Sequence, residues 1–213
     1  MHAVGPTSQP IKVLVVDDHP LMREGIAAVI EREPGMLLVA EASNGHEATE
    51  RFAEHRPDVT LMDLQMPEVD GVAATVAIRA QWSDARIVML TTYRGDTQAR
   101  RSLQAGASGY LLKSMIRNEL LAAIRSVHAG ERWIPREVAA ELAAHLTDDP
   151  LSARELDVLK QVAAGNSNRR VAGELGVTED TVKSHMKSIM SKLSARDRTH
   201  AVMISLKRGI LDP

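Results

Sequence analysis

Three aspartates, a threonine and a lysine in the first part of the chain have side chains suited to chemistry on a phosphate group. Each follows a short apolar run, and they are Asp17, Asp18, Asp63, Thr91 and Lys113. Carboxylates that converge repel one another unless a cation lies among them. Oxygen ligands, with no cysteine in the chain and no histidine pattern nearby, favour a hard ion such as Mg²⁺. A carboxylate beside Mg²⁺ can attack a phosphoryl group to give an acyl phosphate, while an ammonium and a hydroxyl bind the phosphoryl oxygens.

A parallel β-sheet would bring these side chains together. Five short apolar runs are each followed by a helix-like stretch, and the runs are Ile11–Val16, Met36–Ala40, Val59–Met62, Ile87–Leu90 and Gly109–Leu112. This alternation predicts an α/β fold, a parallel sheet with helices on both faces. Right-handed crossovers then place the carboxyl ends of all strands on one edge, where such sheets carry their sites.

Parts of this pattern also have simpler explanations. An Asp-Asp pair after a strand is often a turn and a helix cap, and a lysine after a strand is usually exposed. Asp63 is harder to explain in this way, because LMDLQMPEVDG runs from a buried strand into a loop with Pro and Gly. The complete set in this order favours a site.

Four segments resemble the receiver domain of bacterial two-component response regulators of the NarL/FixJ type. They are VLVVDDHPLMREGI, LMDLQMPEVDG, IVMLTTY and AGASGYLLK. The resemblance covers residues 11–128 and implies a flavodoxin-like sheet and phosphorylation of Asp63 by a sensor histidine kinase. It implies that Mg²⁺ is bound by Asp18, Asp63 and the backbone carbonyl of Gln65, with Asp17 helping through water.

The resemblance also assigns the phosphoryl-binding side of the pocket. It implies that Thr91 and Lys113 bind the phosphoryl group, and that Tyr110 is the aromatic residue that changes rotamer on activation. The family commonly has a cis proline after the lysine, whereas Ser114 follows Lys113 here. Since a cis bond without proline costs ~3–4 kcal/mol, we expect either a trans bond with a shifted loop or a strained site.

The chain changes character in its last third. Residues up to Pro150 carry a net charge of −6 and the remainder carries +4, which suits a second domain that binds a polyanion, although chance variation gives such differences too. We predict a flexible tail over 1–10, a receiver domain over 11–128, a linker with a helical segment over 129–150, and an all-helical domain of four helices over 151–213.

The last domain begins with a helix that runs to Ala164, started by a capping box of Ser152 and Glu155. A short second helix ends at Gly176, and Thr178 caps a third. The apolar stripe of the third helix spans about 60° and consists of Val182, Met186, Ile189 and Leu193. The opposite side carries Lys183, Ser184, Lys187 and Ser191. An apolar stripe opposite a face of Lys and Ser fits a recognition helix in the major groove of DNA. The alternative is that the Lys and Ser form an ordinary solvent-exposed helix face.

The segment LSARELDVLKQVAAGNSNRRVAGELGVTEDTVKSHMKSIMSKL resembles the LuxR-type helix-turn-helix. The resemblance implies that Lys183, Ser184 and Lys187 face bases or nearby phosphates of double-stranded DNA, and that the protein binds paired half-sites as a homodimer. Weaker candidates for backbone contact are Asn168, Arg169, Thr178, Thr181 and His185. A last helix from about Ala195 to Lys207 carries the apolar run AVMI, which suggests either a dimer contact or core packing.

Composition narrows the classes of protein to which this chain could belong. The chain has no cysteine, no apolar run near the ~18 residues of a membrane span, and an N-terminus unlike a signal peptide, so we expect a cytoplasmic protein that does not contact a membrane. We predict a phosphorylation-controlled transcription factor rather than an enzyme; RNA polymerase is left open as a further partner. The alternatives are a protein-binding adaptor and an aspartyl-phosphate phosphatase, but that class of enzyme has a second Asp where this chain has Gln65.

Overall fold

The computed structural model describes residues 9–92, 95–145 and 148–211. Most of the predicted tail, and residues 146–147 of the predicted linker, lie outside these ranges. The described chain divides into two compact units. One consists of the residues up to Thr92 together with 99–136, and the other of residues 95–98 together with those from Glu137 onward. Each unit is described by itself.

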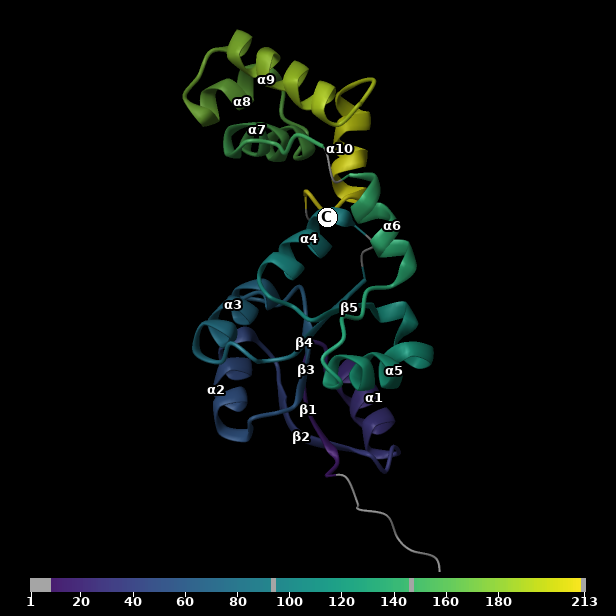
Figure 1. The fold of residues 1–213 in the computed structure, drawn as a ribbon. Helices are drawn as coiled ribbons and strands as arrows, with labels where there is room; N and C mark the ends of the chain where they lie inside the picture. The colour runs from purple at the N-terminus through teal and green to yellow at the C-terminus, as the bar shows by residue number, and fades with distance from the viewer. Residues whose placement is uncertain (1–8, 93–94, 146–147, 212–213) are drawn as a thin grey trace, which may run out of the picture. The chain divides into compact units, whose positions relative to one another are not determined.

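The first unit is built on a parallel sheet, as predicted. Its order is β2-β1-β3-β4-β5, and the strands are β1 (Ile11–Val16), β2 (Met36–Ala42), β3 (Val59–Asp63), β4 (Ile87–Thr91) and β5 (Gly109–Leu112) (Figure 1). Three strands are longer than predicted. Asp63 and Thr91 are therefore the last residues of their strands rather than the first residues of loops, and this ties both to the sheet's hydrogen bonds.

Helices follow the strands and cover both faces of the sheet. They are α1 (Pro20–Glu31), α2 (Gly45–His55), α3 (Gly71–Gln81), α4 (Asp96–Gln104) and α5 (Ile116–His128). Figure 1 shows α1 and α5 on one side of the strands and α2 and α3 on the other. Side-chain caps start two of these helices: Asn44 accepts a 3.0 Å hydrogen bond from the Glu47 amide, and Asp70 accepts a 2.7 Å bond from Ala73.

The core of this unit explains why the sequences of its strands are continuous apolar runs. Alternate residues of each central strand face opposite sides, and both sides are covered. One cluster joins Val15 and Leu61 of the sheet to Ile26 of α1 and Ile124 of α5, and all four are almost fully buried. Each such side chain contributes about 1.5–3 kcal/mol through burial. The sheet is thus a rigid base for the residues at its carboxyl edge.

A short segment after α5 covers the outer edge of β5. The Trp133 amide donates a 3.2 Å hydrogen bond to the Ser108 carbonyl, and the Trp133 carbonyl accepts a 2.7 Å bond from the Tyr110 amide. Trp133 thereby forms a parallel bridge with Gly109. Because unpaired strand edges invite pairing with other chains, this segment protects the edge strand.

Among the described residues, five further helices belong to the second unit, apart from Arg136 at the start of the first of them: α6 (Arg136–Ala144), α7 (Ala153–Ala163), α8 (Asn168–Leu175), α9 (Glu179–Lys192) and α10 (Arg198–Lys207). The capping box of Ser152 and Glu155 is confirmed, and so is the Thr178 cap. The predicted start of the last helix at Ala195 is wrong. Asp197 accepts a 2.8 Å hydrogen bond from the His200 amide and caps the helix, so the preceding residues form a turn.

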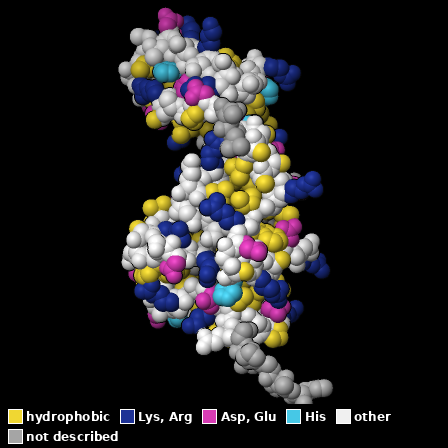
Figure 2. All heavy atoms as spheres, viewed as in Figure 1, with side chains coloured by type: hydrophobic (Ala, Val, Ile, Leu, Met, Phe, Trp, Pro, Cys, Tyr) yellow, Lys and Arg dark blue, Asp and Glu magenta, His cyan; other side chains and the backbone are white. Residues whose placement is uncertain are grey.

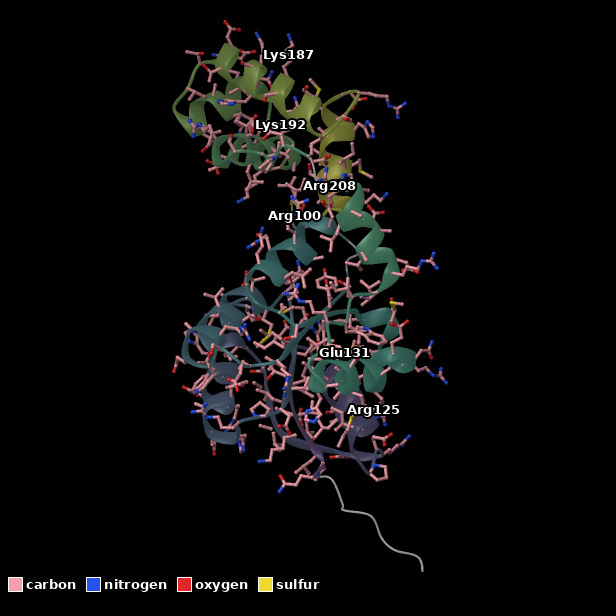
Figure 3. All side chains as sticks on the ribbon, in the orientation of Figure 1. Arg100, Arg125, Glu131, Lys187, Lys192 and Arg208 are labelled. Carbon is pink, nitrogen blue, oxygen red and sulfur yellow. The ribbon has the colours of Figure 1, made fainter. Side chains whose placement is uncertain are left out.

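The helical core confirms the predicted stripe of α9, since Val182, Met186, Ile189 and Leu193 are all buried. Lys187 lies on the side of α9 away from α7, whereas Lys192 lies on the side of α7 (Figure 3). Figure 2 shows Lys and Arg side chains, in dark blue, on the surface of this helical unit. In the apolar run of α10, Ala201 is fully buried and Met203 is 61% exposed. No helix among the described residues is both long and apolar enough to cross a membrane.

Candidate functional site

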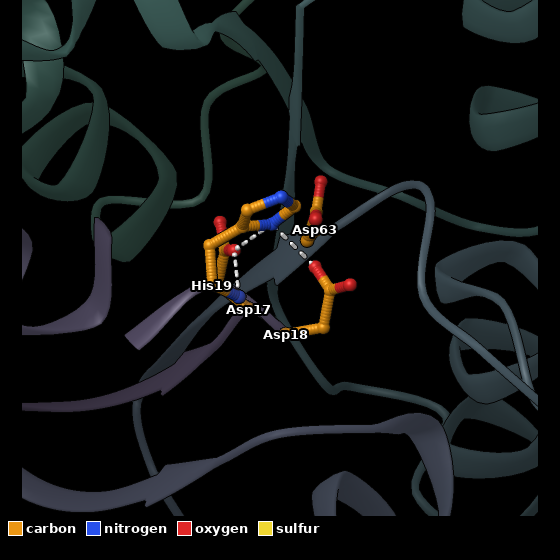
Figure 4. A group of neighbouring side chains, drawn as sticks. All are labelled: Asp17, Asp18, His19 and Asp63. Atoms are coloured by element: carbon orange, nitrogen blue, oxygen red, sulfur yellow. Dashed lines mark hydrogen bonds and ion pairs between the residues drawn. The ribbon is translucent and has the colours of Figure 1, made fainter. Parts of the chain in front are cut away.

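The carboxyl edge of the sheet brings the predicted charged residues together. Lys113 Nζ lies 2.7 Å from Asp17 Oδ2 and 2.9 Å from Asp63 Oδ2. Ligand atoms of Asp17, Asp18, His19 and Asp63 all lie within 4.8 Å of one another (Figure 4). The arrangement is an acidic pocket with one ammonium at its side.

Strand register explains the convergence. Val16 of β1 pairs with Met62 of β3, so Asp17 and Asp63 follow side by side on neighbouring strands. Lys113 follows β5 and starts a 3-10 turn that leads into α5. Its side chain then reaches back to both carboxylates. This is the arrangement expected when parallel strands end at one edge.

Burial controls the electrostatics of the pocket. Asp17 is fully buried and Asp63 is 3% exposed. Burial raises the pKa of Asp63 to about 6; the hydrogen bond from Lys113 opposes this rise, and the charges of Asp17 and Asp18 add to it. Burial alone would lower the pKa of Lys113, but its bonds to the two carboxylates raise that pKa above its ordinary value. Three carboxylates and one ammonium leave an excess of negative charge in the pocket, which a divalent cation would neutralise.

The departure from proline at Ser114 does not displace the lysine. No cis peptide bond occurs among the described residues, so the bond after Lys113 is trans. Of the two predicted outcomes, the strained cis form is therefore wrong. The trans backbone enters a 3-10 turn, and Lys113 still contacts both carboxylates.

Thr91 and Tyr110 lie next to each other beside the pocket. Thr91 ends β4, and Tyr110 lies on the neighbouring strand β5. Thr91 is 2% exposed and Tyr110 is fully buried. Burial raises the pKa of Tyr110 to about 12, against a smaller effect of its hydrogen bond with Thr91. The two side chains thus connect the pocket to β5. Gln65 is exposed just past the strand end.

A histidine lies at the pocket, so the prediction of no histidine pattern nearby is wrong. His19 Nδ1 lies 2.6 Å from Asp18 Oδ1 and 3.3 Å from Asp17 Oδ1. The signal was present in the sequence, because His19 directly follows the two aspartates.

Two further residues that shape the pocket were missed. Arg23 of α1 donates a 2.7 Å hydrogen bond from Nη1 to the Asp17 carbonyl. Gly71 begins α3 so close to β3 that a Cβ atom there would lie 2.1 Å from the Asp63 carbonyl oxygen. The glycine in the PEVDG loop was the signal for the second contact, since only glycine permits such an approach.

The predicted recognition helix presents its polar side to solvent. Lys183, Ser184 and Lys187 are exposed. Lys183 Nζ lies 3.0 Å from Asp180 Oδ1 and 3.8 Å from Glu179 Oε1. Both are solvent-exposed pairs of the first helical turn, which are weak and easily exchanged for phosphate contacts.

The weaker candidates around α9 have mixed environments. The Thr178 hydroxyl accepts a hydrogen bond from the Thr181 amide and lies 2.8 Å from the Thr181 hydroxyl. Arg169 is exposed, whereas Asn168 and His185 are half-buried. Capping thus occupies Thr178 and Thr181, although Thr178, like Arg169, is exposed.

A buried glutamate fixes the recognition helix to α7. Glu155 accepts hydrogen bonds from the Ser188 hydroxyl at 2.6 Å and from Lys192 Nζ at 2.9 Å. Burial would raise the pKa of Glu155, but these bonds and that of the Ser152 amide lower it to about 2. The capping box therefore does more than start α7, because it also orients α9.

Two family descriptions match this architecture. The response regulator receiver domain matches residues 13–125, and the LuxR family of bacterial regulatory proteins matches residues 149–205. The chain belongs to the response regulators that join a receiver domain to a LuxR-type DNA-binding domain. The predicted fold and family are confirmed. This response regulator is in a class of DNA-binding transcription factors rather than enzymes.

Relatives of this response regulator match it over nearly its whole length. It is 35% identical over 216 residues to the transcriptional regulatory protein LnrK of Bacillus subtilis, covering 94% of this chain and 98% of LnrK. It is 36% identical over 210 residues to LiaR of the same organism, covering 95% and 100%.

Solved structures have the same fold. The response regulator ChrA of a heme-sensing two-component system matches with a TM-score of 0.58 and 33% identity, covering 96% of this chain and 100% of ChrA. RcsB from Salmonella enterica serovar Typhimurium, bound to a promoter, matches with a TM-score of 0.72 and 24% identity, covering 92% and 98%.

Proposed function

We propose that Asp63 is the phosphoacceptor of this response regulator and that a sensor histidine kinase supplies the phosphoryl group. The observation that carries the proposal is the contact of Lys113 with the buried carboxylates of Asp17 and Asp63, at 2.7 and 2.9 Å. A carboxylate oxygen of Asp63 forms the new P–O bond as the donor's P–N bond breaks. Lys113 neutralises the phosphoryl oxygens, and the Thr91 hydroxyl donates a hydrogen bond to one of them.

The same pocket is suited to Mg²⁺. Asp18, Asp63 and the Gln65 carbonyl would hold the ion, with Asp17 acting through water. The fit rests on the donor set, which is rich in oxygen, and on the excess negative charge of the pocket. When bound, the ion supplies charge neutralisation at the transferring phosphoryl group.

Thr91 and Tyr110 would carry the signal from the pocket. Their hydrogen bond and burial support this, because movement of Thr91 toward a phosphoryl group must change the packing of Tyr110. The segment after α5 is hydrogen-bonded to the Tyr110 backbone, so β5 and the following chain share this response.

We also propose residues 11–128 as the receiver domain, 129–150 as the linker and 151–213 as the DNA-binding domain. The family matches and the division after Arg136 support these bounds. Lys183, Ser184 and Lys187 are the proposed contacts to bases and phosphates. Secondary contacts are assigned to Asn168, Arg169, Thr178, Thr181 and His185.

On DNA, the protein is proposed to act as a homodimer on paired half-sites. The apolar run of α10, in which Met203 is exposed and Val202 and Ile204 are half-buried, offers surface for a contact between two copies. A solved structure of RcsB contains two dimers bound to two DNAs. The sites themselves can be obtained by selecting bound DNA fragments with the phosphorylated protein.

The test compares operator binding with and without beryllofluoride in three forms of the full chain. We expect beryllofluoride to change the affinity of the wild type and of Asp84→Asn, in which an exposed aspartate in the loop before β4 is changed. It should not change the affinity of Asp63→Asn. Equal affinity of the wild type with and without beryllofluoride would refute the switch.

A further inference from the structure

His19 has no part in the proposed phosphotransfer, yet its side chain is directed at the acidic pocket. The residue occupies the N-cap position of α1 but makes no side-chain cap. Instead its Nδ1 atom lies 2.6 Å from Asp18 Oδ1 (Figure 4). An N-cap side chain ordinarily accepts a hydrogen bond from the first turn of its helix, so this orientation serves the pocket rather than the helix.

The backbone holds the imidazole in this place. The His19 amide donates a 2.9 Å hydrogen bond to Asp17 Oδ1, and Pro20 begins the helix immediately afterwards. Proline restricts the backbone on both sides of the bond before it. The Cα atom of His19 is therefore fixed beside two carboxylates, while 70% of its side chain remains exposed.

Lysine and imidazole contact different oxygen atoms of the pocket. Lys113 contacts the Oδ2 atoms of Asp17 and Asp63, whereas His19 faces the Oδ1 atoms of Asp17 and Asp18. The four candidate ligand atoms span no more than 4.8 Å, about the width across one ion with ligands at roughly 2.0–2.2 Å. One ion bound there would lie within reach of the imidazole and of the Asp18 and Asp63 carboxylates, with Asp17 acting through water.

The ligand preferences of metal ions determine which ion the imidazole nitrogen would bind. Mg²⁺ prefers oxygen ligands, whereas imidazole is a strong ligand for Co²⁺, Ni²⁺ and Zn²⁺. We propose that His19 is a metal ligand of the receiver pocket, and that it makes the pocket bind divalent transition-metal ions of this class. The inference rests on the proposed function, because it takes the same acidic pocket as the metal site.

The test titrates the full-length protein with Co²⁺, followed by visible absorption, and measures Mg²⁺ by competition. In His19→Ala, the Co²⁺ affinity should fall about tenfold or more and the visible band should change. The Mg²⁺ affinity should stay within about twofold, because magnesium does not need the imidazole. His55→Ala, at the far end of α2, and His2→Ala control for other histidines.

Two results would overturn the proposal. One is a His19→Ala variant that binds Co²⁺ with the affinity and spectrum of the wild type. The other is loss of Co²⁺ in His19→Ala combined with intact Co²⁺ binding in Asp18→Asn, which would place the ion outside the pocket. A different result would show that the proposed Mg²⁺ site itself is wrong. In that case the Mg²⁺ affinity would be unchanged in both Asp18→Asn and Asp63→Asn.

Discussion

Replacement of Asp63 by asparagine should stabilise the first unit in the absence of metal. The ionised carboxylate is 3% exposed and shares the pocket with Asp17 and Asp18. Asparagine keeps the shape of the side chain and removes the charge. A residue proposed as the phosphoacceptor is thus expected to cost stability in the unphosphorylated, metal-free protein.

The magnitude follows from the pKa of Asp63, which rises from 3.8 to about 6 on folding. Between these values the folded state binds more protons, so stability falls as the pH rises. Each pH unit is worth about 1.4 kcal/mol, which gives about 3 kcal/mol well above pH 6. The neutral amide of asparagine makes a weaker contact with the Lys113 ammonium than the carboxylate does. This loss offsets about 1 kcal/mol of the gain in stability, so we expect a net gain of about 2 kcal/mol.

Tryptophan fluorescence provides a selective assay. The two tryptophans, Trp82 and Trp133, both lie in the first unit, so urea unfolding of the full chain reports on that unit. With a chelator at pH 7.5, Asp63→Asn should be the more stable form, and Asp84→Asn should match the wild type. The gain should shrink to about a third at pH 5 and vanish near pH 4.5.

Adding Mg²⁺ should reverse the order, since an ion that binds only the native pocket stabilises the wild type. A variant that is less stable than the wild type at pH 7.5 without metal would refute the reasoning. In that case the contact with Lys113 would outweigh the burial of the charge.

Three other changes probe the rest of the structure. Glu155→Gln should destabilise the helical unit by about 2 kcal/mol at pH 7, because charged hydrogen bonds are lost. Since the pKa of Glu155 in the folded protein is about 2, the difference in stability between wild type and variant should disappear as the pH falls from 4.5 toward 2, measured by circular dichroism. Gly71→Ala should destabilise the first unit by about 2 kcal/mol or more, the cost of overpacking. Gly25→Ala, inside α1 with open space around it, should instead stabilise the unit by roughly 0.4–1 kcal/mol in the same urea assay. Lys183→Ala and Lys187→Ala should each weaken DNA binding and lower the slope of log affinity against log salt by about 1; unchanged slopes would exclude phosphate contacts.

The sequence by itself determined the elements and most of the pocket. Apolar runs with period and length typical of buried strands predicted the sheet, and the positions of Asp17, Asp63 and Lys113 after those runs predicted their meeting. These patterns are local, and the parallel topology converts them into a common edge. The buried stripe of α9 was equally readable, because helical periodicity depends only on spacing along the chain.

Only the tertiary structure decided those features of the site that depend on contacts between segments far apart in the chain. Only folding shows that Lys113 reaches two carboxylates through a trans bond before Ser114, and that Gly71 must lack a side chain beside Asp63. The direction of His19 is similar: its position in the sequence is plain, but its rotamer depends on the caps and carboxylates around it. Side-chain direction and close backbone contact are set by three-dimensional packing, which spacing along the chain does not encode.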